Sequence, residues 1–248
     1  MRRRTLLLAA GVSLATLRIA AQKAPVKIVA TIAVEGAFAD IEPSLATRSG
    51  VPVEVEFATT AALVERLANG EAAALAILTK DAVQQLAAKG HVRSSTDLVL
   101  SVIGIAVSDG APVPPMRTTA DFVAFMKATP SIAYTVRGVS GVHMAQLVDQ
   151  LDLAAVVTPK AVVVDGFSGT LLREGKVAAA VQQISELKFT GVTNIVPLPD
   201  EIQVQTIFTL AVLNGATSAD AVEKIVHVLT SPESAAAYER SGASPLFK

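Results

Sequence analysis

The chain has 248 residues, enough for one large or two modest domains, and 51% of them are hydrophobic while 4% are aromatic. A net charge of −1 and the lack of a basic stripe argue against a nucleic-acid partner. The sequence contains no cysteine, which excludes disulfides, thiolate metal sites and cysteine catalysis, and its three histidines are scattered. We therefore expect neither a metal nor a bound cofactor.

The N-terminal segment MRRRTLLLAAGVSLATLRIAAQ reads as an export signal. A basic start is followed by an apolar run over 5–17 and by small residues near Ala21, a pattern that predicts a signal peptide over 1–21. The apolar run is too short to span a bilayer. Arg3 and Arg4 also fit a twin-arginine signal, so we expect export to the periplasm.

From Val26 onward, short apolar runs alternate with segments of helical periodicity. The predicted strands cover 26–32, 52–57, 73–78, 98–107, 132–135, 160–164, 178–182 and 204–213. The predicted helices cover 60–69, 80–89, 119–128, 141–151, 168–175 and 218–230. This alternation predicts an α/β fold in which helices cover both faces of a parallel sheet. The sequence contains no nucleotide-binding glycine motif and no nucleophile elbow.

Two long extended stretches indicate crossings between lobes. DLVLSVIGIAVSDGAPVPP is too long for one ordinary strand, and IVPLPDEIQVQTIFTLAV leads from two prolines into another apolar strand. Two crossings predict a discontinuous first lobe, made of 26–105 plus 199–248, and a second lobe over 106–198. Two lobes joined in this way leave a cleft between them, where a small ligand can bind.

Polar residues follow the predicted strands at the ends where ligands bind in open α/β sheets. Thr59 and Thr60 open one helix, and Asp165 and Gln183 follow two later strands. The loop in TVRGVSGVHMAQLV combines the cation of Arg137 with Ser140 and Gly141 at a predicted helix start, where backbone amides attract anions. The alternative for this loop is a tight turn with Ser140 as the helix cap. The pattern predicts a metal-free pocket that binds a small anion by hydrogen bonds.

Two stretches of the chain resemble periplasmic molybdate-binding proteins, the substrate-binding components of ABC transporters. They are VATIAVEGAFADIEPSLATRSGVPVEVEFATTAALVERLANGEAAALAIL and VQQISELKFTGVTNIVPLPDEIQVQTIFTLAVLNGA, the latter continued by LTSPESAAAYERSGASP. The resemblance implies a two-lobe type II periplasmic-binding-protein fold with an interlobe ligand cleft. It also implies a monomer that delivers its ligand to an ABC permease.

The resemblance implies ligand-binding positions residue by residue. A family serine falls at Ala33, so one hydroxyl is lost, while another falls at Thr60 and is kept. The family's tyrosine falls at Gln183. An acid at Glu35 or Asp165 would repel a tightly held dianion. With the positions read from the residues themselves, the expected ligand site consists of Ala33, Thr59, Thr60, Arg137, Ser140, Gly141, Asp165 and Gln183.

The stretches QQISEL and PLPDEIQ are similar to an aconitate isomerase-like branch of the same family. Two main functions therefore stay open: a solute-binding protein for a small oxyanion or organic carboxylate, and an isomerase that moves a proton on a small polycarboxylate. A sensor or scaffold that kept the fold is a third. An isomerase needs a base with a tuned pKa. The candidates are His143, Glu35, Asp165 and Tyr134, although each also fits an ordinary role as a cap, loop acid or packing residue.

Overall fold

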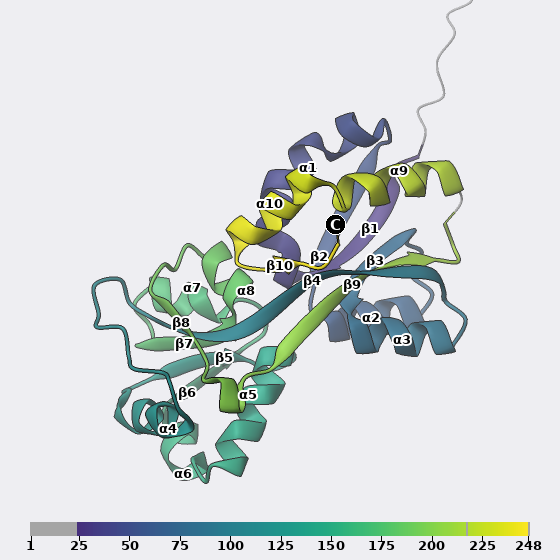
Figure 1. The fold of residues 1–248 in the computed structure, drawn as a ribbon. Coiled ribbons are helices and arrows are strands. Elements are labelled where there is room, and N and C mark those ends of the chain that lie inside the picture. Colours follow the sequence, from purple (N-terminus) through teal and green to yellow (C-terminus); the bar gives the residue numbers. More distant parts are fainter. Residues whose placement is uncertain (1–23, 217, 248) are drawn as a thin grey trace, which may run out of the picture.

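The computed structural model describes residues 24–216 and 218–247, so the predicted signal peptide lies outside the described residues. The first sheet contains three parallel strands and two long strands (Figure 1). One of the long strands leads the chain into the second part of the molecule, and the other leads it back. Its order is β2-β1-β3-β9-β4. The strands are β1 (Val26–Thr31), β2 (Val53–Ala58), β3 (Leu75–Thr79), β4 (Val92–Val107) and β9 (Gln205–Leu213), with the short β10 (Ser244–Pro245) paired to β4.

The second sheet continues from the far half of β4 in the order β4-β7-β5-β6. Its strands are β5 (Ile132–Thr135), β6 (Ala161–Val164) and β7 (Ala179–Gln183), and β8 (Ile195–Pro197) pairs separately with β4. β5 is parallel to both β6 and β7, whereas β7 is antiparallel to β4.

The strand β4 belongs to both sheets. It pairs with β9 as far as Val102 and with β7 from Ile103 onward. β9 is antiparallel to both β3 and β4, so β1, β2 and β3 run in the direction of β4. The parallel strands of the second sheet run against β4. The carboxyl ends of the two sets of strands therefore point toward each other, across the middle of the molecule.

Helices cover both faces of each sheet, as predicted (Figure 1). In the first part, α1 (Glu35–Ser49), α9 (Ala219–Leu229) and α10 (Pro232–Ser241) pack on one face, and α2 (Thr60–Ala68) and α3 (Lys80–Ala88) on the other. In the second part, α4 (Thr119–Ala128), α5 (Val139–Gln150) and α6 (Ala154–Val157) oppose α7 (Ser168–Arg173) and α8 (Ile184–Phe189). Within residues 24–216 and 218–247, three 3-10 turns complete the fold: η1 (Ile32–Val34), η2 (Thr158–Lys160) and η3 (Asp200–Ile202).

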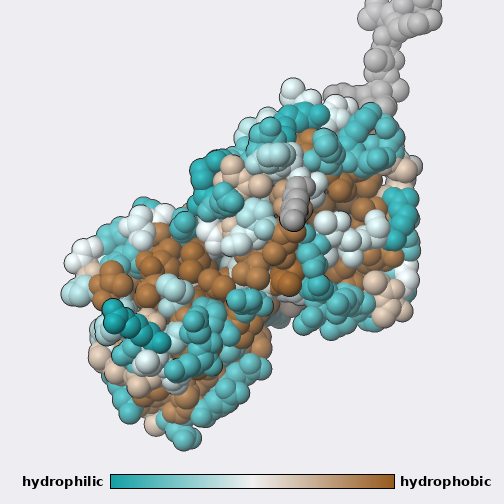
Figure 2. Space-filling view, in the orientation of Figure 1, coloured by the Kyte–Doolittle hydropathy of each residue, from teal (hydrophilic) through white to brown (hydrophobic). Residues whose placement is uncertain are grey.

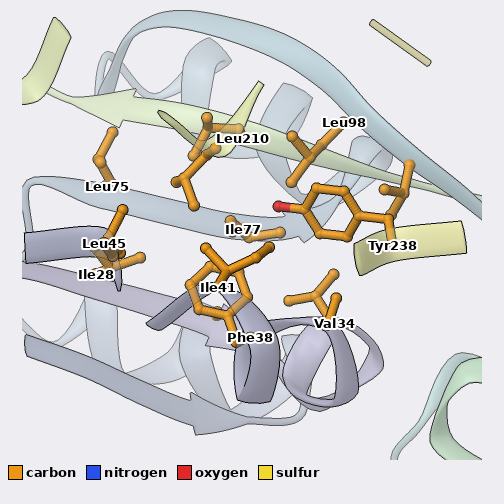
Figure 3. Packing of buried hydrophobic residues seen from close by; sticks show 14 of the residues in the cluster. Ile28, Val34, Phe38, Ile41, Leu45, Leu75, Ile77, Leu98, Leu210 and Tyr238 are labelled. Carbon is orange, nitrogen blue, oxygen red and sulfur yellow. The ribbon is translucent and has the colours of Figure 1, made fainter. Parts of the chain in front are cut away.

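Each part has its own buried core, and the core of the first part is the larger. Tyr238 of α10 lies among Leu98, Leu210 and Ile77, with its hydroxyl pointing into the cluster (Figure 3). That hydroxyl is buried without a hydrogen-bond partner. Figure 2 shows hydrophilic and hydrophobic side chains on the face in view, with hydrophobic patches on both parts as well as where they meet. Among the described residues, no helix has the length and apolarity needed to cross a membrane.

The predicted strands and helices match the observed ones within two residues, except at the start of β4. The sequence analysis missed α1, α6, α8 and α10 and the short strands β8 and β10, and it began β4 six residues late because 92–97 are mostly polar. The expectation of a parallel sheet is wrong for β4 and β9. The predicted lobe limits, 26–105 plus 199–248 and 106–198, stay a prediction. The change of partner along β4 and the path from β8 to β9 lie in the predicted crossings.

Gly141 allows the first turn of α5 to pack against the end of β5. A side-chain carbon at Gly141 would overlap the Thr135 carbonyl. Its own amide donates to the Gly138 carbonyl at 3.0 Å. Gly141 therefore has a packing role whether or not a ligand binds nearby.

We expect Gly141→Ala to destabilise the fold by about 1–3 kcal/mol, the usual cost of overpacking. The clash must also outweigh the gain of about 1 kcal/mol that alanine brings to a helix interior. The urea midpoint of unfolding measures the change. Gly215→Ala is the control, because a side-chain carbon there would have as its nearest neighbour the Ala73 carbonyl oxygen, at 3.8 Å. Equal midpoints for both variants would contradict the packing role.

Candidate functional site

A cavity of about 540 Å³ lies where the carboxyl ends of strands from both sheets meet. Five strands deliver polar residues to its wall directly at their ends or in the loops that follow. β1, β2 and β3 contribute from the first sheet, and β5 and β7 contribute from the second. In chain order the polar wall residues at these ends are Thr31, Thr59, Thr60, Thr79, Arg137, Gln182 and Gln183.

A helix begins at the end of each of these strands, and residues of the first turns of α2, α3 and α5 line the cavity. The first amides of a helix have no intrahelical acceptor and carry a partial positive charge. In α2, the Thr59 hydroxyl accepts from the Ala62 amide at 3.4 Å. By contrast, α3 and α5 start without a side-chain cap, at Thr79 and Gly138. Uncapped helix starts at one cavity favour an anionic ligand.

Two buried polar atoms of residues on the cavity wall have no hydrogen-bond partner. They are the Thr60 hydroxyl and the Gln183 side-chain oxygen. The amide nitrogen of Gln183 donates to the Thr206 hydroxyl at 3.0 Å, which fixes the orientation of that side chain. Buried polar groups are normally satisfied. A ligand with both acceptor and donor atoms would satisfy these two.

The charged residues of the wall are few and of both signs. Arg137 and Asp81 are exposed at the cavity, and no ion pair of Arg137 occurs within the described residues. The Nε2 of His143 lies 2.7 Å from the Ile202 carbonyl, which can only accept, so Nε2 carries the hydrogen. His143 thereby ties α5 to η3. In the part of the chain that the structure describes, no three acidic or histidine residues lie together to hold a metal ion.

Glu186 of α8 is the one acid of the wall that is buried, with 6% of its surface exposed. Burial raises its pKa to about 8, against hydrogen bonds with the Gln183 backbone and the Gln182 side chain that lower it. Gln182 is itself held: its oxygen accepts from the Ser168 amide at 2.8 Å, and its nitrogen donates to the Gly166 carbonyl at 3.0 Å. Near neutral pH the Glu186 side chain is therefore mostly a neutral acid.

The structure brings together half of the residues expected to bind the ligand. Thr59, Thr60, Arg137 and Gln183 line the cavity. Outside its lining lie Ala33 and Ser140, both buried, as well as Gly141 and the exposed Asp165. Whether these residues contact a ligand stays a prediction.

Of the four candidate bases, His143 lies on the wall. Glu35 and Tyr134 lie outside the lining, and partial burial raises the pKa of each. Asp165 also lies outside it. The sequence analysis did not single out Glu186, because no helix was predicted over 184–189. An acid three residues after Gln183 otherwise has the position of an ordinary helix-start acid.

Comparisons with known proteins agree with this architecture. A family described as bacterial extracellular solute-binding protein matches residues 26–243. An aconitate isomerase from Pseudomonas sp is 28% identical over 222 residues, which cover 85% of this chain and 84% of the relative.

Two solved structures show the same fold. The periplasmic molybdate-binding protein of Azotobacter vinelandii has a TM-score of 0.69 at 12% identity, over 88% of this chain and 98% of that one. The sulfate-binding protein SubI of Mycobacterium tuberculosis has a TM-score of 0.67 at 13% identity, over 90% and 87%. At these identities the likeness concerns the fold alone.

The raised pKa of Glu186 predicts a pH dependence of stability. Between about pH 4.5 and pH 8 the folded chain binds more protons at this carboxyl than the unfolded chain does. Its contribution is thus complete below about pH 4.5 and is lost as the pH rises to about 8. Within that window we expect the free energy of unfolding of the wild type to fall, relative to Glu186→Gln, by at most about 1.4 kcal/mol per pH unit.

Urea unfolding at pH 5, 6.5 and 8.5 measures this difference. Glu54→Gln, a change at an exposed carboxylate of β2, is the control and should run parallel to the wild type. Parallel profiles for the wild type and Glu186→Gln would contradict a perturbed Glu186.

Proposed function

Because the chain belongs to the bacterial extracellular solute-binding protein family, we propose that it captures a small organic carboxylate in this cavity. Proteins of this family of ABC transporters bind small ligands and interact with permeases, and they are periplasmic or extracellular. In the proposal the protein is an exported periplasmic monomer that delivers its ligand to an ABC permease. The two lobes close on the ligand about the crossings near 104–107 and 196–199.

The mixed wall of the cavity is the observation that carries the proposal. Hydroxyls, amides and helix starts supply hydrogen-bond donors, but apolar side chains lie between them. A bare oxyanion needs donors on every side, because each of its oxygens loses water on binding. An anion with a carbon skeleton can place its carboxylates on the donors and its carbons on the apolar residues. The apolar part of the wall is Ile32, Ala61, Val64, Ala82, Val139, Val142, Val204 and Phe208.

The balance of charge supports the same class of ligand. Arg137 is the guanidinium on the wall, and its fork of donors matches a carboxylate. Asp81 and Glu186 lie on the same wall and would oppose a compact dianion. The volume of about 540 Å³ also lies in the range of cavities that hold organic ligands.

A second function, isomerisation of a small polycarboxylate, is favoured by two wall residues that can carry protons. His143 and the buried Glu186 both face the cavity from the second part of the molecule. Moving a proton along a carbon skeleton requires a group that removes it and a group that returns it. The likeness to a curated aconitate isomerase supports this reading.

One experiment on the mature chain separates these functions. Calorimetric titrations with citrate, cis-aconitate, trans-aconitate, molybdate and sulfate at pH 7 identify the ligand class, and we expect binding of at least one carboxylate and of neither oxyanion. The same protein is then incubated with cis-aconitate and assayed for the trans isomer. Tight binding of molybdate or sulfate alone would contradict the carboxylate proposal. If the wild type converts cis-aconitate to the trans isomer and Glu186→Gln does not, the second function is the correct one.

Thr60 provides a test of the cavity wall from the first part of the molecule. Thr60→Val keeps the shape of the side chain and removes its buried, unpartnered hydroxyl. We expect the affinity for the carboxylate that binds to fall by about 1–3 kcal/mol, since a ligand atom would then be left unpaired. Calorimetry measures the loss, and Thr170→Val, an exposed site on α7, is the control. Unchanged affinity in Thr60→Val would contradict a role of Thr60 in ligand binding and indicate that the residue only packs.

A further inference from the structure

We propose that Glu186 binds the ligand as a carboxylic acid, so that its hydroxyl donates to a carboxylate oxygen and capture of the anion takes up a proton. This inference rests on the proposed function and states which group of the same cavity, Glu186, is protonated when the ligand binds. It holds for a binding protein and for an isomerase alike.

Glu186 lies on the cavity wall, and its carboxyl is hydrogen-bonded to the Gln183 backbone and the Gln182 side chain. The side chain lines the cavity and is almost fully buried. Behind it, both ends of the Gln182 amide are engaged, by Ser168 and by the Gly166 carbonyl. At the end of the helix, the Thr190 hydroxyl donates to the Leu187 carbonyl at 2.6 Å, which closes α8. A buried acid on a helix held in this way, at the wall of the cavity, is placed to contact a ligand bound there.

Among the described residues, no cation is paired with this carboxyl: no ion pair includes Glu186. Burial raises its pKa and two hydrogen bonds lower it, with no charged neighbour among the causes. Nearby basic groups have other partners: Lys188 donates to the Arg240 carbonyl, and Arg173 donates to the Thr190 carbonyl. Besides Glu186, the cavity wall carries the titratable or charged groups Asp81, Arg137 and His143. The elements that pack against α8 carry Glu35, Asp40, Glu42, Arg48, Arg93, Asp97, Arg173, Glu233, Tyr238, Glu239 and Arg240.

An ionised Glu186 and an anion cannot share this cavity at low cost. Two like charges repel strongly where water is excluded. Protonation removes the repulsion and turns one oxygen into a donor, which suits a carboxylate ligand. The anion therefore binds the protonated form, and by linkage it raises the proton affinity of Glu186.

The linkage predicts a distinct dependence on pH. With a free pKa of about 8, Glu186 already holds its proton at pH 7, so binding there takes up little. At pH 9 most of the free protein has lost that proton, and binding must restore it. We expect an uptake close to one proton per ligand at pH 9 and an affinity about tenfold weaker than at pH 7.

Calorimetry with trans-aconitate tests this, at pH 7 and pH 9 and in two buffers of different ionisation enthalpy. If trans-aconitate does not bind, the titrant is the carboxylate from the earlier panel that binds most tightly. Glu186→Gln should show no proton uptake at pH 9 and similar affinities at the two pH values. Glu35→Gln is the matched control, because Glu35 is another partly buried acid with a raised pKa but lies outside the lining, and it should retain the uptake.

The outcomes are distinguishable. If the wild type binds the carboxylate at both pH values without proton uptake at pH 9, the result agrees with the proposed function and overturns this inference. Uptake that persists in Glu186→Gln overturns it as well. If no carboxylate of the panel binds, the proposed function fails and the inference fails with it. A wild type that binds without uptake overturns the inference by itself, so that outcome does not depend on the stability of any variant.

Discussion

The continuity of β4 is the constraint on which the rest of the structure depends. A single strand hydrogen-bonds to β9 in its first half and to β7 in its second, so it belongs to two sheets whose parallel strands run in opposite directions. Gly104 sits where the partners have changed, and a side-chain carbon there would approach Ile184 at 2.9 Å and Ile195 at 3.0 Å. Close packing at this point holds α8 and β8 against the shared strand. The site exists because this arrangement turns two sets of strand ends toward one another.

That arrangement places neutral groups around the cavity. Backbone amides at helix starts and the side chains of Thr60 and Gln183 are held by the elements that end there, so a ligand in the cavity would require little reordering of them. Apolar residues share the wall with them, and each polar group of a ligand must find a donor or acceptor in a matching place. Selectivity in such a cavity comes from the positions of groups more than from the amount of charge.

At Glu186, a group that can exchange a proton with a ligand also lowers the stability of the fold when it ionises. A buried acid without an ion pair costs folding free energy as soon as it ionises. A glutamine or a leucine would avoid that cost but could neither titrate nor exchange a proton with a ligand. Keeping an acid at this position is therefore understandable if the proton takes part in what the cavity does. The Ser168 amide and hydroxyl and the Gly166 carbonyl satisfy the side chain of Gln182, which limits the local cost.

The sequence by itself determined the α/β class, most strands and helices, and polar strand ends such as Thr59–Thr60 and the loop at Arg137, because hydrophobic periodicity and helix-start chemistry are local. It could not determine that β4 and β9 run antiparallel to their neighbours, since strand direction depends on partners far away in the chain. It also did not separate Gln183 on the wall from Ala33 in the core, because Gln183 ends one strand and Ala33 follows another. The burial of Glu186 beside the cavity was decided by tertiary structure alone. An acid in the first turn of a short helix is ordinary until the surrounding elements bury it, and only burial beside a cavity changes its proton affinity.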